Sequence, residues 1–278
     1  MSVALTDDTF AARAEAAPSP RPDAPSPAAI PTVVLGGLPI AVQDRGEAAR
    51  LMNDWALSRR GRGLPPLYVT SANGQVLSNC ATDPEIRALF AEADLIHADG
   101  TPMVVASRYV CARPLPERLA TTDLVHDSAK VAEATGTRFY FLGGSPEVNR
   151  KAVANMRALY PRLVFAGARD GYFKREDEDA LVAEINAAAP DILWIGFGVP
   201  LEQRFVSRNR HRLTGVGLIK TSGGLFDFLS GAKSRAPGLM QRFGLEWFYR
   251  MMLEPKRLGR RYLTTNPHAV WLLATRSR

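Results

Sequence analysis

The sequence predicts an α/β fold in which a parallel sheet is covered by helices on both faces and is followed by a basic helical appendage. Short apolar runs alternate with amphipathic segments between about residues 32 and 231, which is the pattern of strands that alternate with helices. Hydrophobic residues make up 46% of the 278 positions, enough for one core domain of roughly 200 residues with appendages. The positive charge is concentrated near the C-terminus, where from residue 233 onward ten Lys and Arg stand against two Glu, a net charge of +8.

The predicted strands are the short apolar runs. They are Leu67–Thr70, Asp94–His97, Arg138–Leu142, Leu163–Ala168, Ile192–Phe197 and Leu218–Thr221. Helices are expected between them, with start signals at Asp83-Pro84 and at Ser145-Pro146-Glu147, where a capping residue precedes a proline. In such sheets ligands bind at the carboxyl ends of the strands, so the loops after the strands are the place to seek a site.

The chain divides into three predicted parts. Residues 1–30 are rich in Ala and Pro and are expected to form a disordered leader. Residues 31–234 are expected to form the α/β core, and residues 235–278 a basic, amphipathic appendage that associates with membranes.

The appendage is expected to contain an amphipathic helix over Leu239–Leu253, followed by a basic cluster at 256–261 and an apolar stretch around Trp271. Basic residues interleaved with aromatic ones suit a helix that lies in the interface of an anionic membrane; the alternative is an ordinary docked helix with a solvated basic side. No apolar run approaches the ~20 residues needed to cross a bilayer, and no secretory signal opens the chain. We therefore expect a cytoplasmic protein that is peripheral on the inner face of the cell membrane.

Metal ligands and redox cysteines are not indicated. Cys80 and Cys111 lack paired-ligand spacing and are expected to be reduced and in or near the core. The four histidines form no ligand pattern, and His97 is expected to be buried. The only Asp-x-Asp triplet, residues 177–179, lies in a charge run that is expected to be a solvated helix face. No metal and no cofactor are predicted.

Five loops after predicted strands carry polar or glycine residues. They are Thr70-Ser71-Ala72-Asn73-Gly74, Ala98-Asp99-Gly100, Gly143-Gly144-Ser145, Pro200-Leu201-Glu202-Gln203 and Gly223-Gly224-Leu225-Phe226-Asp227. Each alone is weak, because Asp-Gly is usually a turn and Gly-Gly before a helix is usually a close connection. Such a Gly-Gly also presents backbone N–H groups that can bind a phosphate. Together, at one edge of a parallel sheet, the five loops predict a binding site.

These loops carry a resemblance to a known family. Further matching segments, in the same order, are the Arg118 to Asp123 segment, Asp170-Gly171-Tyr172-Phe173, Arg235-Ala236-Pro237, Glu246-Trp247-Phe248-Tyr249-Arg250 and Glu254-Pro255-Lys256-Arg257. Over roughly residues 67–261 the chain resembles the WecG/TagA/CpsF family of glycosyltransferases (glycosyltransferase family 26). The resemblance implies a Rossmann-like core and an inverting, metal-independent transfer of a sugar from a UDP-sugar donor to a polyprenyl-diphosphate-linked acceptor, in bacterial exopolysaccharide or cell-surface polysaccharide biosynthesis.

The resemblance also implies roles for individual residues. Asp99 matches the carboxylate that takes the proton of the acceptor hydroxyl, although by itself it reads as a turn aspartate. Ser71 and Asn73 are expected to contact the sugar or the acceptor, and Gly143 and Gly144 to approach the phosphates.

The remaining implied residues serve the donor. Glu202, Gln203 and Asp227 are expected to line its pocket, and Asp227 reads equally well as a helix cap. The growing charge of the UDP leaving group is expected to be neutralised by arginines. The candidates are Arg118 in the core and Arg250, Arg257 and Arg260 in the appendage, each of the last three having a surface charge as its alternative reading.

The sequence departs from the family pattern at Glu202 and Gln203, since members usually have these two residue types in the exchanged order. This leaves the two roles, and the donor sugar, open. Two other classes fit the sequence less well. A Rossmann oxidoreductase would need a Gly-x-Gly-x-x-Gly loop after a strand, which this sequence lacks, and a basic nucleic-acid-binding protein would need a recognition module, of which the sequence shows none. We therefore expect no nucleic-acid partner, and we leave open a soluble acceptor and a homo-oligomer.

Overall fold

The computed structural model describes residues 24–238, 240 and 245–278, without the side chains of Arg250, Arg257, Arg260 and Arg261. Its strands are β1 (Thr32–Leu35), β2 (Leu38–Ala41), β3 (Leu67–Ala72), β4 (Leu95–Ala98), β5 (Arg138–Gly143), β6 (Val164–Arg169), β7 (Ile192–Gly196) and β8 (Leu218–Thr221). Its helices are α1 (Arg45–Arg59), α2 (Gly74–Thr82), α3 (Pro84–Ala91), α4 (Thr101–Val110), α5 (Thr121–Thr135), α6 (Pro146–Leu159), α7 (Glu178–Ala188), α8 (Leu201–Asn209), α9 (Leu225–Leu229), α11 (Glu246–Leu253) and α12 (Pro255–Thr275). The predicted alternation of strands and helices is confirmed.

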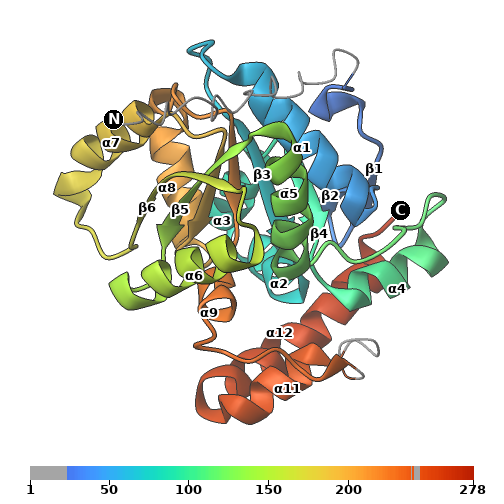
Figure 1. Cartoon of the computed structure of the whole chain (residues 1–278). Helices are drawn as coiled ribbons and strands as arrows, with labels where there is room; N and C mark the ends of the chain where they lie inside the picture. Colours follow the sequence, from blue (N-terminus) through green and yellow to red (C-terminus); the bar gives the residue numbers. More distant parts are fainter. Residues whose placement is uncertain (1–23, 239, 241–244) are drawn as a thin grey trace, which may run out of the picture.

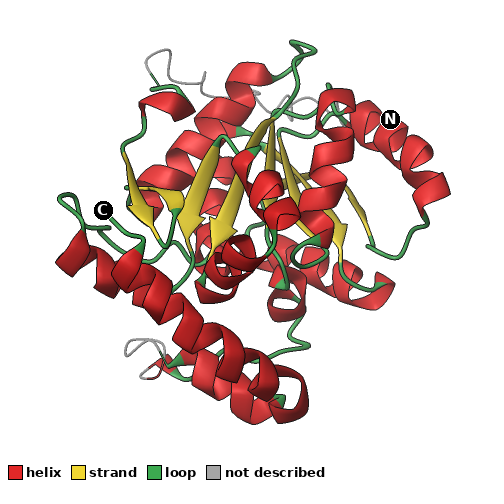
Figure 2. Ribbon diagram, turned by 180° about the vertical axis from the view of Figure 1, so that it is seen from behind, coloured by secondary structure: helices red, strands yellow, loops and turns green. Residues whose placement is uncertain are grey.

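Strands β3 to β8 form one parallel sheet in the order β4-β3-β8-β7-β5-β6. All six predicted strands are present, with ends that differ from the predicted ones by two residues at most. Because the strands are parallel, their carboxyl ends meet at one edge of the sheet. Figure 2 shows that α11 and α12 lie beyond this edge.

Helices cover both faces of this sheet, as predicted (Figure 1). Helices α1, α5 and α6 cover one face, where Phe141 and Trp194 are fully buried. Helices α7 and α8 cover the other face, where Tyr140 and Ile195 are fully buried. Neighbouring residues of one strand point to opposite faces, so both faces are apolar, which explains why the strands read as continuous apolar runs.

The antiparallel hairpin of β1 and β2 was not predicted. Leu35 pairs with Leu38 across a two-residue turn of Gly36 and Gly37, whose φ angles are +57° and +88°. A two-residue turn with positive φ at both positions matches the twist of a hairpin, and glycine adopts it without strain. The hairpin packs beside β4, outside the parallel sheet.

The two predicted helix starts are confirmed. The Asp83 carboxylate accepts hydrogen bonds from the backbone N–H groups of Glu85 and Ile86 at the start of α3. The Ser145 hydroxyl accepts from the N–H of Val148 at 3.2 Å, so α6 begins immediately after the loop that follows β5. This cap fixes the position of a loop that belongs to the candidate site.

The N-terminal segment lies partly within the described residues. Residues 1–23 of the predicted leader lie outside them. Closer to the core, the Pro25 carbonyl accepts a hydrogen bond from the indole N–H of Trp55 at 2.7 Å, and Ile30 is buried. The chain is therefore packed against α1 from about residue 25 onward.

The C-terminal segment leaves the core and returns to it. Helix α11 covers the second half of the predicted amphipathic helix, whose positions 239 and 241–244 lie outside the described residues. Helix α12 packs on α2 and α4, and Leu272 and Leu273 are buried there. Arg278 then exchanges two backbone hydrogen bonds with Val34 of β1, at 2.9 and 3.1 Å. Among the helices described, none combines the length and the apolar character that crossing a bilayer requires.

Candidate active site

A cavity of about 800 Å³ opens at the carboxyl ends of the parallel strands. The loops after β3, β4, β5, β7 and β8 line it, together with the end of α11 and the start of α12. Of the residues that the sequence singles out, the cavity contains Ser71, Asn73, Asp99, Gly144, Glu202 and Asp227. The five polar loops are therefore brought together in one place.

The loop after β3 presents Ser71 and Asn73 to the cavity. Asn73 is the N-cap of α2, and its side-chain oxygen accepts from the backbone N–H of Val76 at 3.1 Å. The Ser71 hydroxyl lies 3.4 Å from that of Thr121, which also lines the cavity. The loop is thus fixed by its helix cap, and Ser71 keeps hydrogen-bonding capacity toward the cavity.

Asp99 lines the cavity directly after β4. Its backbone N–H donates to the carbonyl of Ala72 at 2.8 Å, which ties the loop after β4 to the loop after β3. Its carboxylate attracts the ammonium of Lys220 in β8, which is separated from β4 by β3 in the sheet. The structure therefore brings a carboxylate next to Ser71 and Asn73 in a partly enclosed space.

The loop after β5 depends on two glycines. Gly143 has φ +140°, and a Cβ atom there would lie 2.3 Å from the carbonyl oxygen of Gly196. Gly144 has φ +69° and lines the cavity, whereas Gly143 lies just behind it. Only glycine allows this close approach, and it places the positive end of α6 at the cavity.

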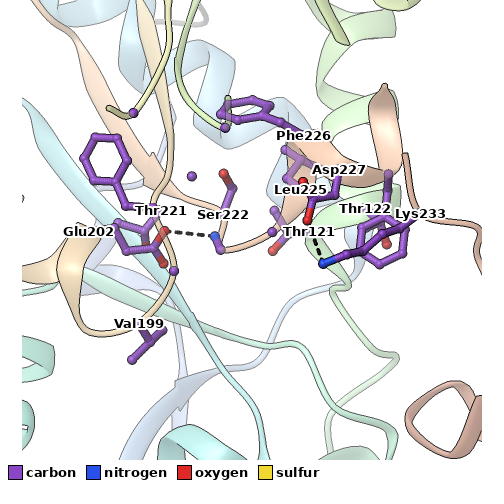
Figure 3. Close-up of a pocket in the computed structure, with 18 of the residues that line it drawn as sticks. Thr121, Thr122, Val199, Glu202, Thr221, Ser222, Leu225, Phe226, Asp227 and Lys233 are labelled. Carbon is purple, nitrogen blue, oxygen red and sulfur yellow. Dashed lines mark hydrogen bonds and ion pairs between the residues drawn. The ribbon is translucent and has the colours of Figure 1, made fainter. Parts of the chain in front are cut away.

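Glu202 is a buried carboxylate at the start of α8. It accepts from the backbone N–H of Gly223 at 2.9 Å and from the Gln203 amide at 3.3 Å. Burial raises the pKa of the Glu202 carboxyl, against the opposing effects of these hydrogen bonds and of the Lys220 charge. Figure 3 shows the hydrogen bond that joins it to the loop after β8.

Gln203 does not line the cavity. It is 1% exposed, and its amide nitrogen lies 3.5 Å from the hydroxyl of Thr70 in β3. Of this exchanged pair, the structure thus places the glutamate at the cavity wall and the glutamine beneath it.

Asp227 lies in the first turn of α9 and forms an ion pair with Lys233 at 2.8 Å (Figure 3). Lys233 also lies 3.4 Å from the carboxylate of Glu254, which precedes α12. All three residues line the cavity. Sequence reasoning missed Lys233, which supplies a cation on the side of the cavity where the appendage meets the core.

Arg118 lies outside the cavity lining. Its guanidinium is 3.0 Å from the carboxylate of Glu246 in α11 and 3.7 Å from that of Asp123 in α5. Arg235 pairs with the same two carboxylates. This cluster joins the appendage to the core. Burial by itself would lower the pKa of Arg235, but the carboxylates of Asp123 and Glu246 outweigh it, so the pKa is raised.

The predicted appendage arginines are placed only by their backbone. Arg250 lies in α11, and Arg257 and Arg260 lie in α12, but their side chains are outside the described residues. The roles of these arginines therefore remain predictions.

Sequence reasoning also missed Lys220, which is fully buried in β8. Its ammonium donates to the Ser71 hydroxyl at 2.7 Å. His97 in β4 is buried as predicted, and burial, aided by the charge of Lys220, lowers the pKa of its imidazole well below the usual range. The local signal is a charged residue within an apolar strand, three residues before Gly223. It marks Lys220 as unusual but does not show that the side chain is buried.

Two further predictions concern possible metal ligands. Within the part of the chain that the structure describes, no three His, Cys, Asp or Glu side chains are grouped as a metal ion would require. The prediction that residues 177–179 form a solvated face was wrong for Glu178. This residue is buried, because its carboxylate pairs with Arg208 and accepts from Asn209 at 3.0 Å.

Comparison with protein-family models identifies the class of protein to which this site belongs. The model described as "Glycosyl transferase WecG/TagA/CpsF family" matches residues 33–278. The match includes every strand from β2 to β8, all the cavity loops, and α11 and α12. The chain belongs to the WecG/TagA/CpsF family of glycosyl transferases.

Proposed function

We propose that this protein transfers a sugar from a UDP-sugar to a polyprenyl-diphosphate-linked acceptor, with inversion and without a metal, during the synthesis of a bacterial exopolysaccharide or other cell-surface polysaccharide. Family membership gives the class of reaction. The observation that carries the proposal is the position of Asp99, which shares one cavity with Ser71, Asn73 and the glycine-rich loops after β5 and β8.

The proposed base is Asp99. An inverting transfer joins the acceptor oxygen to the anomeric carbon as the bond to UDP breaks, and the acceptor hydroxyl must lose its proton. A carboxylate within hydrogen-bonding reach can take that proton. Ser71 and Asn73, on the adjacent loop, can orient the hydroxyl groups of the sugar or the acceptor.

The proposed site of the UDP diphosphate is the side of the cavity formed by Gly144 and Ser145. Helix α6 begins there, and its positive N-terminal end favours a phosphate. Lys233 adds an ammonium on the appendage side. These groups support a transfer in which the protein itself neutralises the leaving group.

The proposed acceptor side is the mouth of the cavity beside the appendage. Leu253 and Leu258, from α11 and α12, line the cavity. On the outer surface of the same helices Trp247, Phe248 and Leu263 are exposed. Exposed aromatic and aliphatic side chains on basic helices suit an anionic membrane surface, so a lipid-linked acceptor can reach the cavity from the membrane on the inner face.

The test of this proposal is UDP release from a panel of UDP-sugars in the presence of EDTA, with and without a synthetic polyprenyl-diphosphate-sugar acceptor. We expect release that depends on the acceptor and persists in EDTA. The Asp99→Asn variant should lose about a hundredfold or more of kcat, the usual effect of removing a general base.

The matched control is Asp179→Asn, because this aspartate is exposed on α7 and does not line the cavity. It should retain the wild-type rate. Absence of release with every donor and acceptor, from folded wild-type protein, would refute the proposed reaction, and loss of release in EDTA would refute its metal independence. The anomeric configuration of the product, read by NMR, decides between inversion and retention.

The membrane part of the proposal has its own test. Co-sedimentation should be stronger with vesicles that contain phosphatidylglycerol than with phosphatidylcholine alone, and it should weaken when Trp247 and Phe248 are both changed to Ser. Equal sedimentation with both vesicle types would refute an anionic membrane partner.

A further inference from the structure

Lys220 is a charged side chain in the centre of the parallel sheet. It lies in β8 between Val69 of β3 and Trp194 of β7, and its exposure is 0%. Burial of an ammonium is strongly unfavourable unless charges and hydrogen bonds compensate it. A buried position in the centre of a sheet normally holds an aliphatic residue. The reason for a lysine here must therefore lie in the groups that it contacts.

The hydrogen bonds of Lys220 fix the direction of the Ser71 hydroxyl. The ammonium lies 2.7 Å from the Ser71 Oγ and 3.2 Å from the Thr221 carbonyl oxygen. An ammonium can only donate, so Ser71 must accept from it, and the hydrogen of Ser71 must point elsewhere. The direction that remains is toward Thr121, 3.4 Å away, or toward a ligand in the cavity that both residues line.

The charges around Lys220 connect it to the proposed base. Burial lowers the pKa of Lys220 to about 8, and the carboxylates of Asp99 and Glu202 oppose that fall. The imidazole of His97, in β4, has a lowered pKa because it is buried and near the Lys220 charge, so it is neutral near pH 7. Lys220 is therefore a cation at neutral pH that interacts electrostatically with the carboxylates of Asp99 and Glu202, which both line the cavity.

We propose that Lys220 is a positioning residue, which directs the Ser71 hydroxyl into the cavity as a donor and holds Asp99 in its ionised, proton-accepting form. This inference rests on the proposed function, because it assigns Asp99 as the base. The ammonium touches neither substrate in this arrangement and acts through Ser71 and Asp99. Loss of the ammonium should thus weaken the base at low pH more than at high pH.

The first experiment measures the ionisation of Asp99 without any turnover. The carboxyl carbon of Asp99 is followed by NMR through a pH titration in wild-type protein, in Lys220→Met and in the surface control Lys151→Met. The Asp99→Asn variant assigns the signal. We expect the Asp99 titration to move to higher pH in Lys220→Met and to stay in place in Lys151→Met, whose lysine is exposed and pairs with exposed Glu147.

The second experiment measures the pH profile of kcat/KM. In Lys220→Met we expect a loss of about ten- to a hundredfold near pH 7, the range for a lost hydrogen bond to a charged group, with a smaller loss at higher pH. Ser71→Ala should cost less in the Lys220→Met background than in the wild type, because part of the effect of Lys220 passes through the Ser71 hydroxyl. Lys220→Gln, checked for folding by circular dichroism, serves if the Met variant does not fold.

The outcomes separate the two proposals. An Asp99 titration that is identical in wild type and in both Lys220 variants would overturn the inference about the ionisation, and additive effects with Ser71→Ala would overturn the inference about the hydroxyl. If the wild-type protein releases no UDP while the titration of Asp99 moves as expected, the proposed function fails and the electrostatic role of Lys220 stands.

Discussion

The buried position of Lys220 predicts how stability changes with pH. Its pKa falls from the ordinary 10.5 to about 8 in the folded protein, a change that corresponds to about 3 kcal/mol. The perturbation is Lys220→Met, which removes the titrating group and keeps a side chain of similar length. The free energy of unfolding of the two proteins is then compared at a series of pH values.

The sign follows from proton counts. Between about pH 8 and 10.5 the lysine is protonated in the unfolded chain and increasingly neutral in the folded protein. The unfolded state then binds more protons, so the free energy of unfolding of the wild type rises with pH relative to Lys220→Met. Below about pH 8 both states carry the proton, and the difference between the two proteins is constant.

The assay is urea denaturation followed by tryptophan fluorescence, at pH 7, 8, 9 and 10, with both proteins in the same buffers. Other titrating groups are common to both proteins and largely cancel in the difference. We expect the difference to shift in favour of the wild type by up to about 3 kcal/mol as the pH rises through this window. A difference that is constant from pH 7 to 10 would show that the lysine is not in the low-dielectric setting described here.

Three other variants test the packing and the loop geometry. Asn149→Ala removes an amide that donates to backbone carbonyls of β5 and β6 at 2.8 and 2.9 Å, and it should lower the free energy of unfolding by about 2–4 kcal/mol in urea denaturation; a loss under 1 kcal/mol would contradict this account. Leu272→Ala empties a fully buried position of α12 and should cost about 2–5 kcal/mol, whereas no loss would mean that α12 is not docked. Gly143→Ala should weaken UDP binding at least about tenfold in calorimetry, because its Cβ would lie 2.3 Å from a backbone oxygen; unchanged affinity would contradict the role of this loop.

Much of the fold could be predicted because its signals are local. The six parallel strands are buried on both faces, so each reads as a compact apolar run, and Pro84 and Pro146 mark helix starts directly. The β1–β2 hairpin was missed although its Gly36-Gly37 turn is a local signal, because each strand has only four residues. Four residues are too few for alternation to stand out from the neighbouring apolar sequence.

The candidate site was predictable only in part. The position of polar loops after strands located Ser71, Asn73 and Asp99, since parallel strands end at one edge. Lys220 could not be placed, because a lysine in a strand is normally exposed and its burial depends on strand order. Nothing local in the sequence indicates that Arg118 pairs with Glu246, a residue more than a hundred positions away.

Because the C-terminus returns to the β1–β2 hairpin, the appendage is fixed to the core at both of its ends. At its first end Ala236 is buried and Arg235 pairs with Asp123. At its last end Leu272 is buried and the backbone of Arg278 is hydrogen-bonded to β1.

A segment that is fixed at both ends can move only over a short distance. Leu253, Glu254 and Leu258 form part of the cavity wall. Under the proposed membrane association, any displacement of α11 and the start of α12 by the lipid surface would therefore change the mouth of the cavity. A deletion that begins at Arg235 would also remove Leu272 from the core. The role of the appendage is therefore better tested by substitutions in α11 and at the start of α12 than by truncation.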